Sequence, residues 1–231
     1  MNMFLITVCL CSGLGAAEWP GPVAGGYYLP NGWRITPVGT PIPIEDLVLN
    51  IVPAPDDKVL VAVNGGYNPH GLVVIDAARP EAVQRIIVPT AWSGLAWHPA
   101  RDKLYVSGGN NNDAKGIRAP IYIFSYNNGR LSDAPVGQLM EDIEPAQIYW
   151  SGLVHHPSRS ILFAANRTAG NVVVFDTDSG KLLQRIPTEV NPYDLVLSPD
   201  AKTLYCSNWA SDSVSVIDTE TYRVRATIGV G

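Results

Sequence analysis

Apolar and polar residues follow one another in short runs along most of this chain, and turn residues separate the runs. The clearest runs are residues 72–76, 172–176 and 214–218, which are rich in Val and Ile and end at an aspartate. Residues of this kind favour strands, and no stretch of the sequence shows a long helical period. The pattern therefore predicts an all-β protein.

Three residue positions recur in register four times. In each copy a proline ends the first apolar run, a leucine follows five residues later, and asparagine or glycine follows nine residues later. These positions are Pro55, Pro99, Pro157 and Pro199, then Leu60, Leu104, Leu162 and Leu204, then Asn64, Gly108, Asn166 and Asn208. Successive prolines lie 44, 58 and 42 residues apart, a period typical of propeller blades. We predict a β-propeller of four-stranded antiparallel blades, with blades that start near residues 49, 93, 151 and 193.

Each predicted blade has the same plan. A Pro-containing turn joins the first strand to the second, and an aspartate turn joins the third strand to the fourth. The expected first strands are 49–52, 94–97, 152–155 and 194–197, the second strands are 59–63, 103–107, 161–165 and 203–207, and the third strands are 72–76, 121–125, 172–176 and 214–218.

The N-terminal region differs from the repeats. Residues 1–17 form an apolar run that ends in small residues, which is typical of a cleaved signal peptide although no basic residue precedes the run. Residues 18–48 are rich in Gly and Pro and predict an extended lead-in with a possible outer strand. We therefore expect export to a bacterial periplasm or secretion, and no membrane span in the mature chain, since the apolar run is too short for one.

The charge balance disfavours two classes of partner. The chain has 16 basic and 21 acidic side chains and a net charge of −5. Nucleic acids and anionic membranes draw their affinity mainly from basic clusters, which this sequence lacks. Cys9 and Cys11 would leave with the signal peptide, so Cys206 would remain as an apolar strand residue without a disulfide partner.

The last repeat carries a resemblance to a known family. Its segments Ser-Pro-Asp at 198–200, Leu-Tyr-Cys-Ser-Asn at 204–208 and Val-Ser-Val-Ile-Asp at 214–218 resemble the YVTN-type propellers, which include the seven-bladed lactonase-like folds. The resemblance implies that the present chain, with its four repeats, is a fragment of a seven-bladed ring.

A narrower likeness covers residues 29–110. This stretch looks like the start of exported bacterial proteins that join a propeller to a C-terminal phosphoesterase of the alkaline-phosphatase superfamily. In that family the metal-dependent hydrolysis belongs to the phosphoesterase domain. The resemblance therefore implies a phosphoesterase partner domain and gives no catalytic residue, metal ligand or cofactor to this chain.

Strand direction sorts the loops into two faces. The inter-blade loops and the loops between second and third strands share one face, called here the loop face; the Pro-containing turns share the other, where we expect a structural role. Amides and aromatic rings gather on the loop face and suit a polar small molecule or a protein partner. With two histidines and one arginine included, the candidates are Asn64, Tyr67, His70, Trp92, Asn110, Trp150, His155, Asn166, Arg167, Tyr193, Asn208 and Trp209.

Each kind of candidate has a structural alternative. The recurring asparagines suit turns, and Trp92 and Trp150, which occupy the same repeat position by sequence spacing, suit packing between blades. His155 precedes a Pro turn, where its repeat equivalents favour packing. The acidic residues Asp133, Glu141, Asp142 and Glu144 in the long connection of the second blade could hold a cation, but they lack the expected spacing and favour a solvated loop.

Two functions from different classes follow from these residues. The first is a binding or interaction scaffold that is non-catalytic by itself and is linked to a phosphoesterase. The alternative is a lactonase-like hydrolase that acts through the channel with His155, Asn166 or Asn208. No nucleophile elbow, phosphate loop or zinc spacing can be assigned.

Overall fold

The computed structural model describes residues 19–39, 41–44, 46–109 and 119–230. The chain divides into two compact units, residues 1–41 and 42–231. The first unit holds a small antiparallel sheet of β1 (Gly21–Val23), β2 (Gly26–Tyr28) and β3 (Arg34–Ile35). The predicted signal peptide, residues 1–17, lies outside the described residues.

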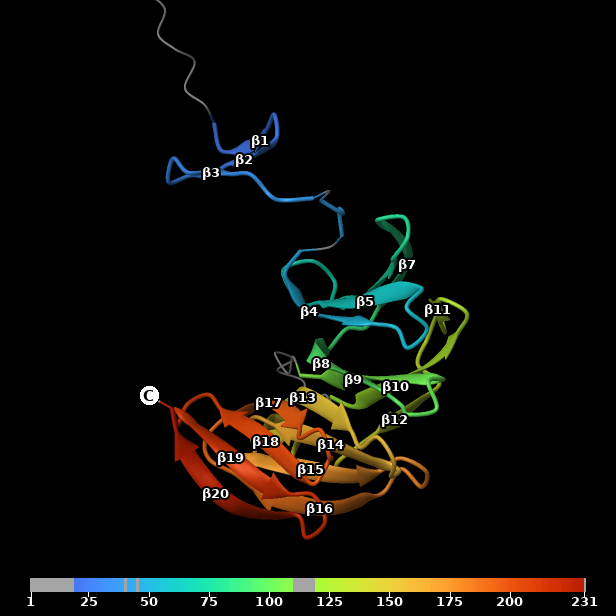
Figure 1. Ribbon diagram of the computed structural model, residues 1–231, viewed down its shortest axis with the longest axis vertical. Coiled ribbons are helices and arrows are strands. Elements are labelled where there is room, and N and C mark those ends of the chain that lie inside the picture. Colours follow the sequence, from blue (N-terminus) through green and yellow to red (C-terminus); the bar gives the residue numbers. More distant parts are fainter. Residues whose placement is uncertain (1–18, 40, 45, 110–118, 231) are drawn as a thin grey trace, which may run out of the picture. The chain divides into compact units, whose positions relative to one another are not determined.

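The second unit consists of antiparallel sheets that follow one another in chain order (Figure 1). Each sheet is one predicted blade, and the predicted fold class is confirmed. Blade 1 contains β4 (Val48–Pro53), β5 (Val59–Asn64), β6 (Gly71–Asp76) and β7 (Glu81–Ile87). Blade 2 contains β8 (Ala91–Trp97), β9 (Lys103–Gly108), β10 (Ile121–Asn127), β11 (Arg130–Leu131) and β12 (Gly137–Leu139).

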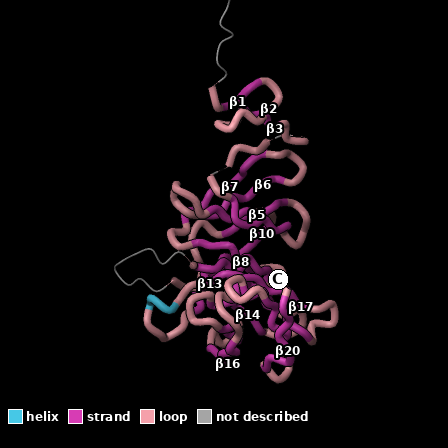
Figure 2. The backbone as a smooth tube through the Cα atoms, turned by 90° about the vertical axis from the view of Figure 1, so that its left-hand side faces the viewer, coloured by secondary structure: helices cyan, strands magenta, loops and turns pink. Residues whose placement is uncertain are grey.

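The other two blades are more regular. Blade 3 contains β13 (Trp150–His155), β14 (Ile161–Asn166), β15 (Asn171–Asp176) and β16 (Leu182–Pro187). Blade 4 contains β17 (Pro192–Leu197), β18 (Thr203–Asn208), β19 (Ser213–Asp218) and β20 (Arg223–Gly229). Among the described residues the 3-10 turn η1 (Pro145–Gln147), cyan in Figure 2, is the one helical element, and no helix there is long and apolar enough to span a bilayer.

The core lies between the blades. One apolar cluster joins blades 1 and 2, a second joins blades 2 and 3, and a third joins blades 3 and 4. The clusters form because alternate residues of each strand face one neighbour or the other. Cys206 is buried in the third cluster, where burial raises the pKa of its thiol to about 12.

The outer faces of the first and last blades differ. In blade 1 the face turned from blade 2 packs against Ile42 and Ile44 of the lead-in. In blade 4 the corresponding face is open: Tyr205 is 38% exposed and Ile228 is 50% exposed. The residues 42 positions earlier, Phe163 and Ile186, are buried against blade 4. The open face is therefore of the kind that another blade covers, and the expectation of a longer ring stays a prediction.

Candidate functional site

Five side chains on the loop face form a continuous row, called here the aromatic row: Trp92, Tyr149, Arg167, Trp209 and Tyr193. The rings of Trp92 and Tyr149 meet edge to face with centroids 5.3 Å apart. The Arg167 guanidinium carbon lies 4.8 Å from the Tyr149 ring centroid and 5.6 Å from that of Trp209. The Trp209 and Tyr193 centroids are 5.5 Å apart. The row thus runs from blade 2 to blade 4.

A repeated backbone hydrogen bond sets the spacing of the row. In every blade the residue after the second strand donates its amide to the residue just before the first strand. The bonds are Gly65 to Leu47, Gly109 to Thr90, Arg167 to Tyr149 and Trp209 to Asn191, with N–O distances of 3.2, 2.8, 2.9 and 2.9 Å. The repeat therefore brings the Arg167 and Tyr149 side chains together on one loop pair.

Gly109 makes room for Trp92, whereas Gly65 lies at ordinary contact distance from its ring. A Cβ added to Gly65 would lie 3.6 Å from the indole, and one added to Gly109 would lie 2.8 Å from the Trp92 Cβ and 2.5 Å from the Trp150 carbonyl oxygen. A side chain at position 109 would therefore push the indole away. The Trp92 Nε1 atom is buried and has no hydrogen-bond partner among the described residues.

The row carries one positive charge at neutral pH. Burial raises the pKa of Tyr149 to about 12, although the Arg167 cation lowers it. The phenol is therefore neutral, and the guanidinium of Arg167 supplies the charge of the row. Aromatic faces attract such a cation, which explains why Arg167 lies over both rings.

The three recurring asparagines are buried and hold their own loops. Asn166 accepts the amides of Tyr149 and Ala169 at 3.2 and 3.3 Å. Asn208 donates to the Ser213 and Ser215 hydroxyls at 3.1 and 2.9 Å, and Asn64 donates to the Pro69 carbonyl at 3.3 Å. Their amides therefore position the loops that carry the aromatic row.

Trp150 does not share the position of Trp92. The strand register pairs Trp150 with Asn166 and Ala91 with Gly108, so Trp150 corresponds to Ala91. An irregular register between Ala91 and Leu95 shifts the alignment by one residue. Trp150 is fully buried, and its indole donates to the Ala119 carbonyl at 3.0 Å, so it packs between blades as the structural alternative predicted.

Blade 1 holds three further candidates apart from the row. Tyr67 is fully exposed, and its backbone amide donates to Asp46 Oδ2 at 2.6 Å. His70 is buried, with Nδ1 3.2 Å from the Ala91 carbonyl oxygen. Asn64 and His70 line a hollow of about 280 Å³. The last candidate, Asn110, lies outside the described residues.

His155 lies at the end of β13 that is remote from Asn166. Strand β13 begins at Trp150, which pairs with Asn166, and ends at His155, which pairs with Leu162. The His155 ring forms two hydrogen bonds, from Nδ1 to the His156 carbonyl at 2.8 Å and from Nε2 to the Thr177 hydroxyl at 3.2 Å. The ring centroids of His155 and His98 lie 4.9 Å apart. The structure therefore places His155 at the Pro-turn face and does not bring it together with Asn166.

A comparison of the sequence with family models identifies the family of the chain. A model described as lactonase, seven-bladed β-propeller, matches residues 94–226, which include four of the five residues of the aromatic row. The chain belongs to this lactonase propeller family. The lactonase-like resemblance predicted from the last repeat is confirmed.

Solved structures agree on the fold of this lactonase-family propeller. Kuenenia stuttgartiensis hydrazine synthase matches with 20% identity and a TM-score of 0.59 over 73% of this chain and 58% of that chain. A functionally unknown protein from Desulfotomaculum acetoxidans matches with 18% identity and a TM-score of 0.61 over 76% and 52%. The chain thus spans little more than half the length of each structure. No curated protein sequence matches it.

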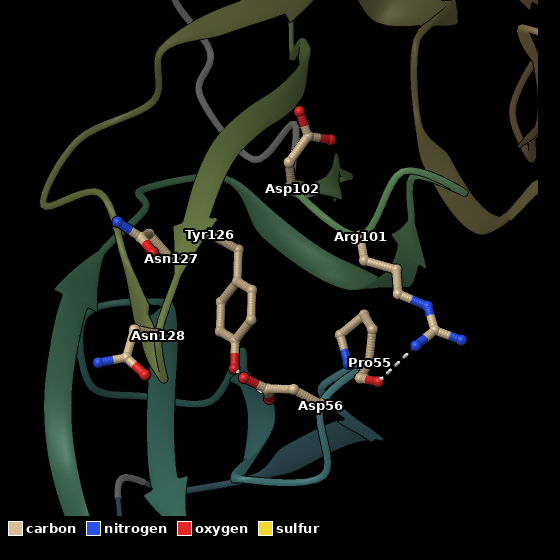
Figure 3. Close-up of a pocket in the computed structure, with 7 residues that line it drawn as sticks. All are labelled: Pro55, Asp56, Arg101, Asp102, Tyr126, Asn127 and Asn128. Atoms are coloured by element: carbon tan, nitrogen blue, oxygen red, sulfur yellow. Dashed lines mark hydrogen bonds between the residues drawn. The ribbon is translucent and has the colours of Figure 1, made fainter.

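The Pro-turn face of the lactonase-family propeller carries a hollow that the sequence did not reveal. About 220 Å³ in volume, it lies between blades 1 and 2 and is lined by Pro55, Asp56, Arg101, Asp102, Tyr126, Asn127 and Asn128 (Figure 3). The Tyr126 hydroxyl donates to Asp56 at 2.6 Å, which lowers the pKa of that carboxyl, and Arg101 donates to the Pro55 carbonyl at 3.3 Å. These bonds tie the two blades together, as expected for structural turns.

The long connection of blade 2 corrects one prediction. We expected its acidic residues to be solvated, but Glu141 is buried, accepts a hydrogen bond from Arg185 Nε, and lies 3.3 Å from Asn166 Nδ2. Asp133 also has a partner, since it accepts from Gln84 Nε2 at 3.0 Å. No group of metal ligands is present among the described residues.

We expect acid to destabilise the folded lactonase-family propeller through His155. Burial lowers the pKa of His155 to about 4, so between pH 6.5 and 4 the unfolded chain binds the proton and the folded chain does not. The free energy of unfolding therefore falls as pH falls through this window, by up to about 3 kcal/mol. Urea unfolding at pH 7 and pH 4.5 measures the change.

The variant His155→Asn should reduce this pH dependence. Some dependence should remain, because burial also lowers the pKa of His156. An equally steep loss of stability in the variant and the parent chain would show that His155 does not cause it.

Proposed function

We propose that this chain is the binding part of an exported propeller, non-catalytic by itself, and that the aromatic row on the loop face holds its ligand. The observation that carries the proposal is the row itself: Trp92, Tyr149, Trp209 and Tyr193 present rings beside the single cation of Arg167. Rings supply apolar contact area, and a few polar groups fix the orientation of a small ligand.

Two further features support a ligand at this face. The Trp92 Nε1–H is buried without an acceptor among the described residues, and an unmet buried donor costs about 1–3 kcal/mol. An acceptor oxygen of a ligand would remove this cost once the indole moves to expose the atom. The loops are also held by the buried asparagines, so the row is formed before a ligand arrives and less ordering is required on binding.

Export and the link to a phosphoesterase belong to the same proposal. Residues 1–17 support export because their apolar run ends in small residues. The likeness of residues 29–110 to exported propeller–phosphoesterase proteins supports the link. In this arrangement the propeller would bind a partner or substrate group and the second domain would carry out hydrolysis.

The second candidate is lactone hydrolysis on the loop face, the activity in the name of the matching family. Arg167 would polarise the lactone carbonyl, a water would add to the carbonyl carbon, the ring C–O bond would break, and a proton of that water would pass to the leaving alkoxide to give the hydroxy acid. The arrangement counts against His155 acting together with Asn166, since Asn166 pairs with the first residue of β13 and His155 is its last.

One set of measurements separates the two functions. We expect the purified chain to bind benzamide in ligand-observed NMR, and we expect Trp209→Ala to weaken binding about tenfold, the lower end of the effect of losing a stacked ring. Trp33→Ala, which removes an exposed tryptophan of the first unit, is the control and should leave binding unchanged.

The same samples are assayed for turnover. We expect no hydrolysis of p-nitrophenyl phosphate, bis-p-nitrophenyl phosphate or dihydrocoumarin, with or without added divalent metal. Ring opening of dihydrocoumarin that survives repurification and is lost in Arg167→Gln would favour the hydrolase. Benzamide binding that is the same in Trp209→Ala and the parent chain would contradict the binding proposal.

A further inference from the structure

Arg167 has no acidic partner among the described residues, unlike three other arginines of this chain. Arg79, Arg185 and Arg225 form ion pairs with Asp76, Glu141 and Asp218. No carboxylate of the described residues pairs with Arg167, although acidic side chains outnumber basic ones by 21 to 16 in the sequence. Its half-buried cation instead lies over the rings of Tyr149 and Trp209.

Apart from a side-chain hydrogen bond to Tyr149, the two rings leave most of the hydrogen-bonding capacity of Arg167 unused. A guanidinium has five N–H donors in a fixed plane, and a ring face attracts its charge without accepting those bonds in the way that an oxygen does. A carboxylate can accept two of them side by side, the strongest pairing available to arginine. An anion with two acceptor oxygens would use these donors best.

The neighbours of Arg167 define what should be attached to that anion. Trp209 is 65% exposed, and its ring lies 5.5 Å from Tyr193 and 5.6 Å from the Arg167 guanidinium carbon. A flat ring that stacks on Trp209 would keep an attached carboxylate within reach of the guanidinium. We propose that the aromatic row binds a small aromatic carboxylate, with Arg167 on the carboxylate and Trp209 on the ring; this assignment rests on the proposed function.

A carboxylate suits this site better than a phosphate. The row supplies one positive charge, and the chain as a whole carries −5. A phosphate dianion needs more positive charge to offset the loss of its hydration, whereas a carboxylate is matched by a single guanidinium. Inorganic phosphate is therefore a useful competing probe.

The test compares two probes that differ in charge and little in shape. Isothermal titration and ligand-observed NMR at pH 7 measure the binding of benzoate and benzamide to the whole chain. We expect benzoate to bind about tenfold more tightly or better, because of its charge-assisted bonds to Arg167. In Arg167→Gln the two probes should bind equally, and Arg130→Gln, which removes an exposed arginine of the β10–β11 hairpin, should keep the preference for benzoate.

The outcomes separate this inference from the proposed function. Equal binding of benzoate and benzamide by the parent chain, or a preference that survives in Arg167→Gln, would overturn the carboxylate assignment. If Trp209→Ala still weakens both probes in that case, the binding face stands and its ligand is neutral. Phosphate that displaces benzoate at equal concentration would also overturn the assignment, in favour of a general anion site. A circular dichroism spectrum that matches the parent chain excludes misfolding of each variant.

Discussion

Gly94→Ala should destabilise the propeller by about 3 kcal/mol or more, the upper part of the range for overpacking in a tight core. Gly94 lies in β8, the first strand of blade 2, where an added Cβ would collide with the Ser151 carbonyl oxygen of blade 3 and lie 2.8 and 2.9 Å from Leu153 Cγ and Ser107 Oγ. The backbone atom cannot move without shifting β13, and the Gly94 amide is already fixed by its bond to Ser107. Urea unfolding followed by tryptophan fluorescence measures the loss.

The matched control for this prediction is Gly229→Ala. Gly229 lies near the end of β20, where an added Cβ meets nothing within 4 Å, so the free energy of unfolding should stay within about 0.5 kcal/mol of the parent value. If Gly94→Ala proved as stable as Gly229→Ala, the close approach of the first strands of blades 2 and 3 would not be required for the fold.

The fold could be predicted from the sequence because its information is local and repeated. A proline turn, a leucine and a small polar residue at fixed spacing define each blade, and the four copies confirm one another. The strands lie within a few residues of the predicted ranges, since alternation and turn residues set them without reference to the rest of the chain. The one part that deviates, blade 2, is the part where the period of the repeat is broken.

The contents of the candidate site could be predicted only in part. Arg167, Trp209 and Tyr193 were assigned to the loop face from strand direction alone. Their contacts could not be predicted, because Arg167 lies between the rings of Tyr149 and Trp209, which belong to loops of different blades. The equivalence of Trp92 and Trp150 failed because one irregular step in β8 shifts the register by a residue, which spacing in the sequence does not reveal.

Glu141 shows a second limit of the sequence. In a polar, irregular connection an acidic residue is usually solvated, and its partner Arg185 lies 44 residues away in β16 of the next blade. Such a pair depends on how two blades pack and has no local signal. The pair is also connected to the candidate site, because Asn166 donates to Glu141 and accepts a hydrogen bond from the amide of Tyr149.

Arg185→Met should therefore destabilise the chain by about 3–5 kcal/mol, as expected when one partner of a buried ion pair is removed. The Glu141 side chain is 0% exposed, whereas that of Arg185 is 46% exposed. Removing the arginine leaves a buried carboxylate with Asn166 as its remaining described partner. Urea unfolding measures the stability, and NMR binding of benzamide reports whether the Tyr149 loop has moved.

The double variant Glu141→Met/Arg185→Met distinguishes a charge effect from a packing effect. Replacing both members of a buried pair by apolar residues of similar volume is often neutral or stabilising, so the double variant should recover most of the stability that Arg185→Met loses. Arg130→Met, at an exposed hairpin position, should change the stability by less than about 0.5 kcal/mol. A double variant as unstable as Arg185→Met would mean that the arginine stem, and not the uncompensated carboxylate, supports the contact between blades 2 and 3. If the double variant recovers both its stability and its benzamide binding, the unpaired charge of Glu141 is what displaces the Tyr149 loop in Arg185→Met.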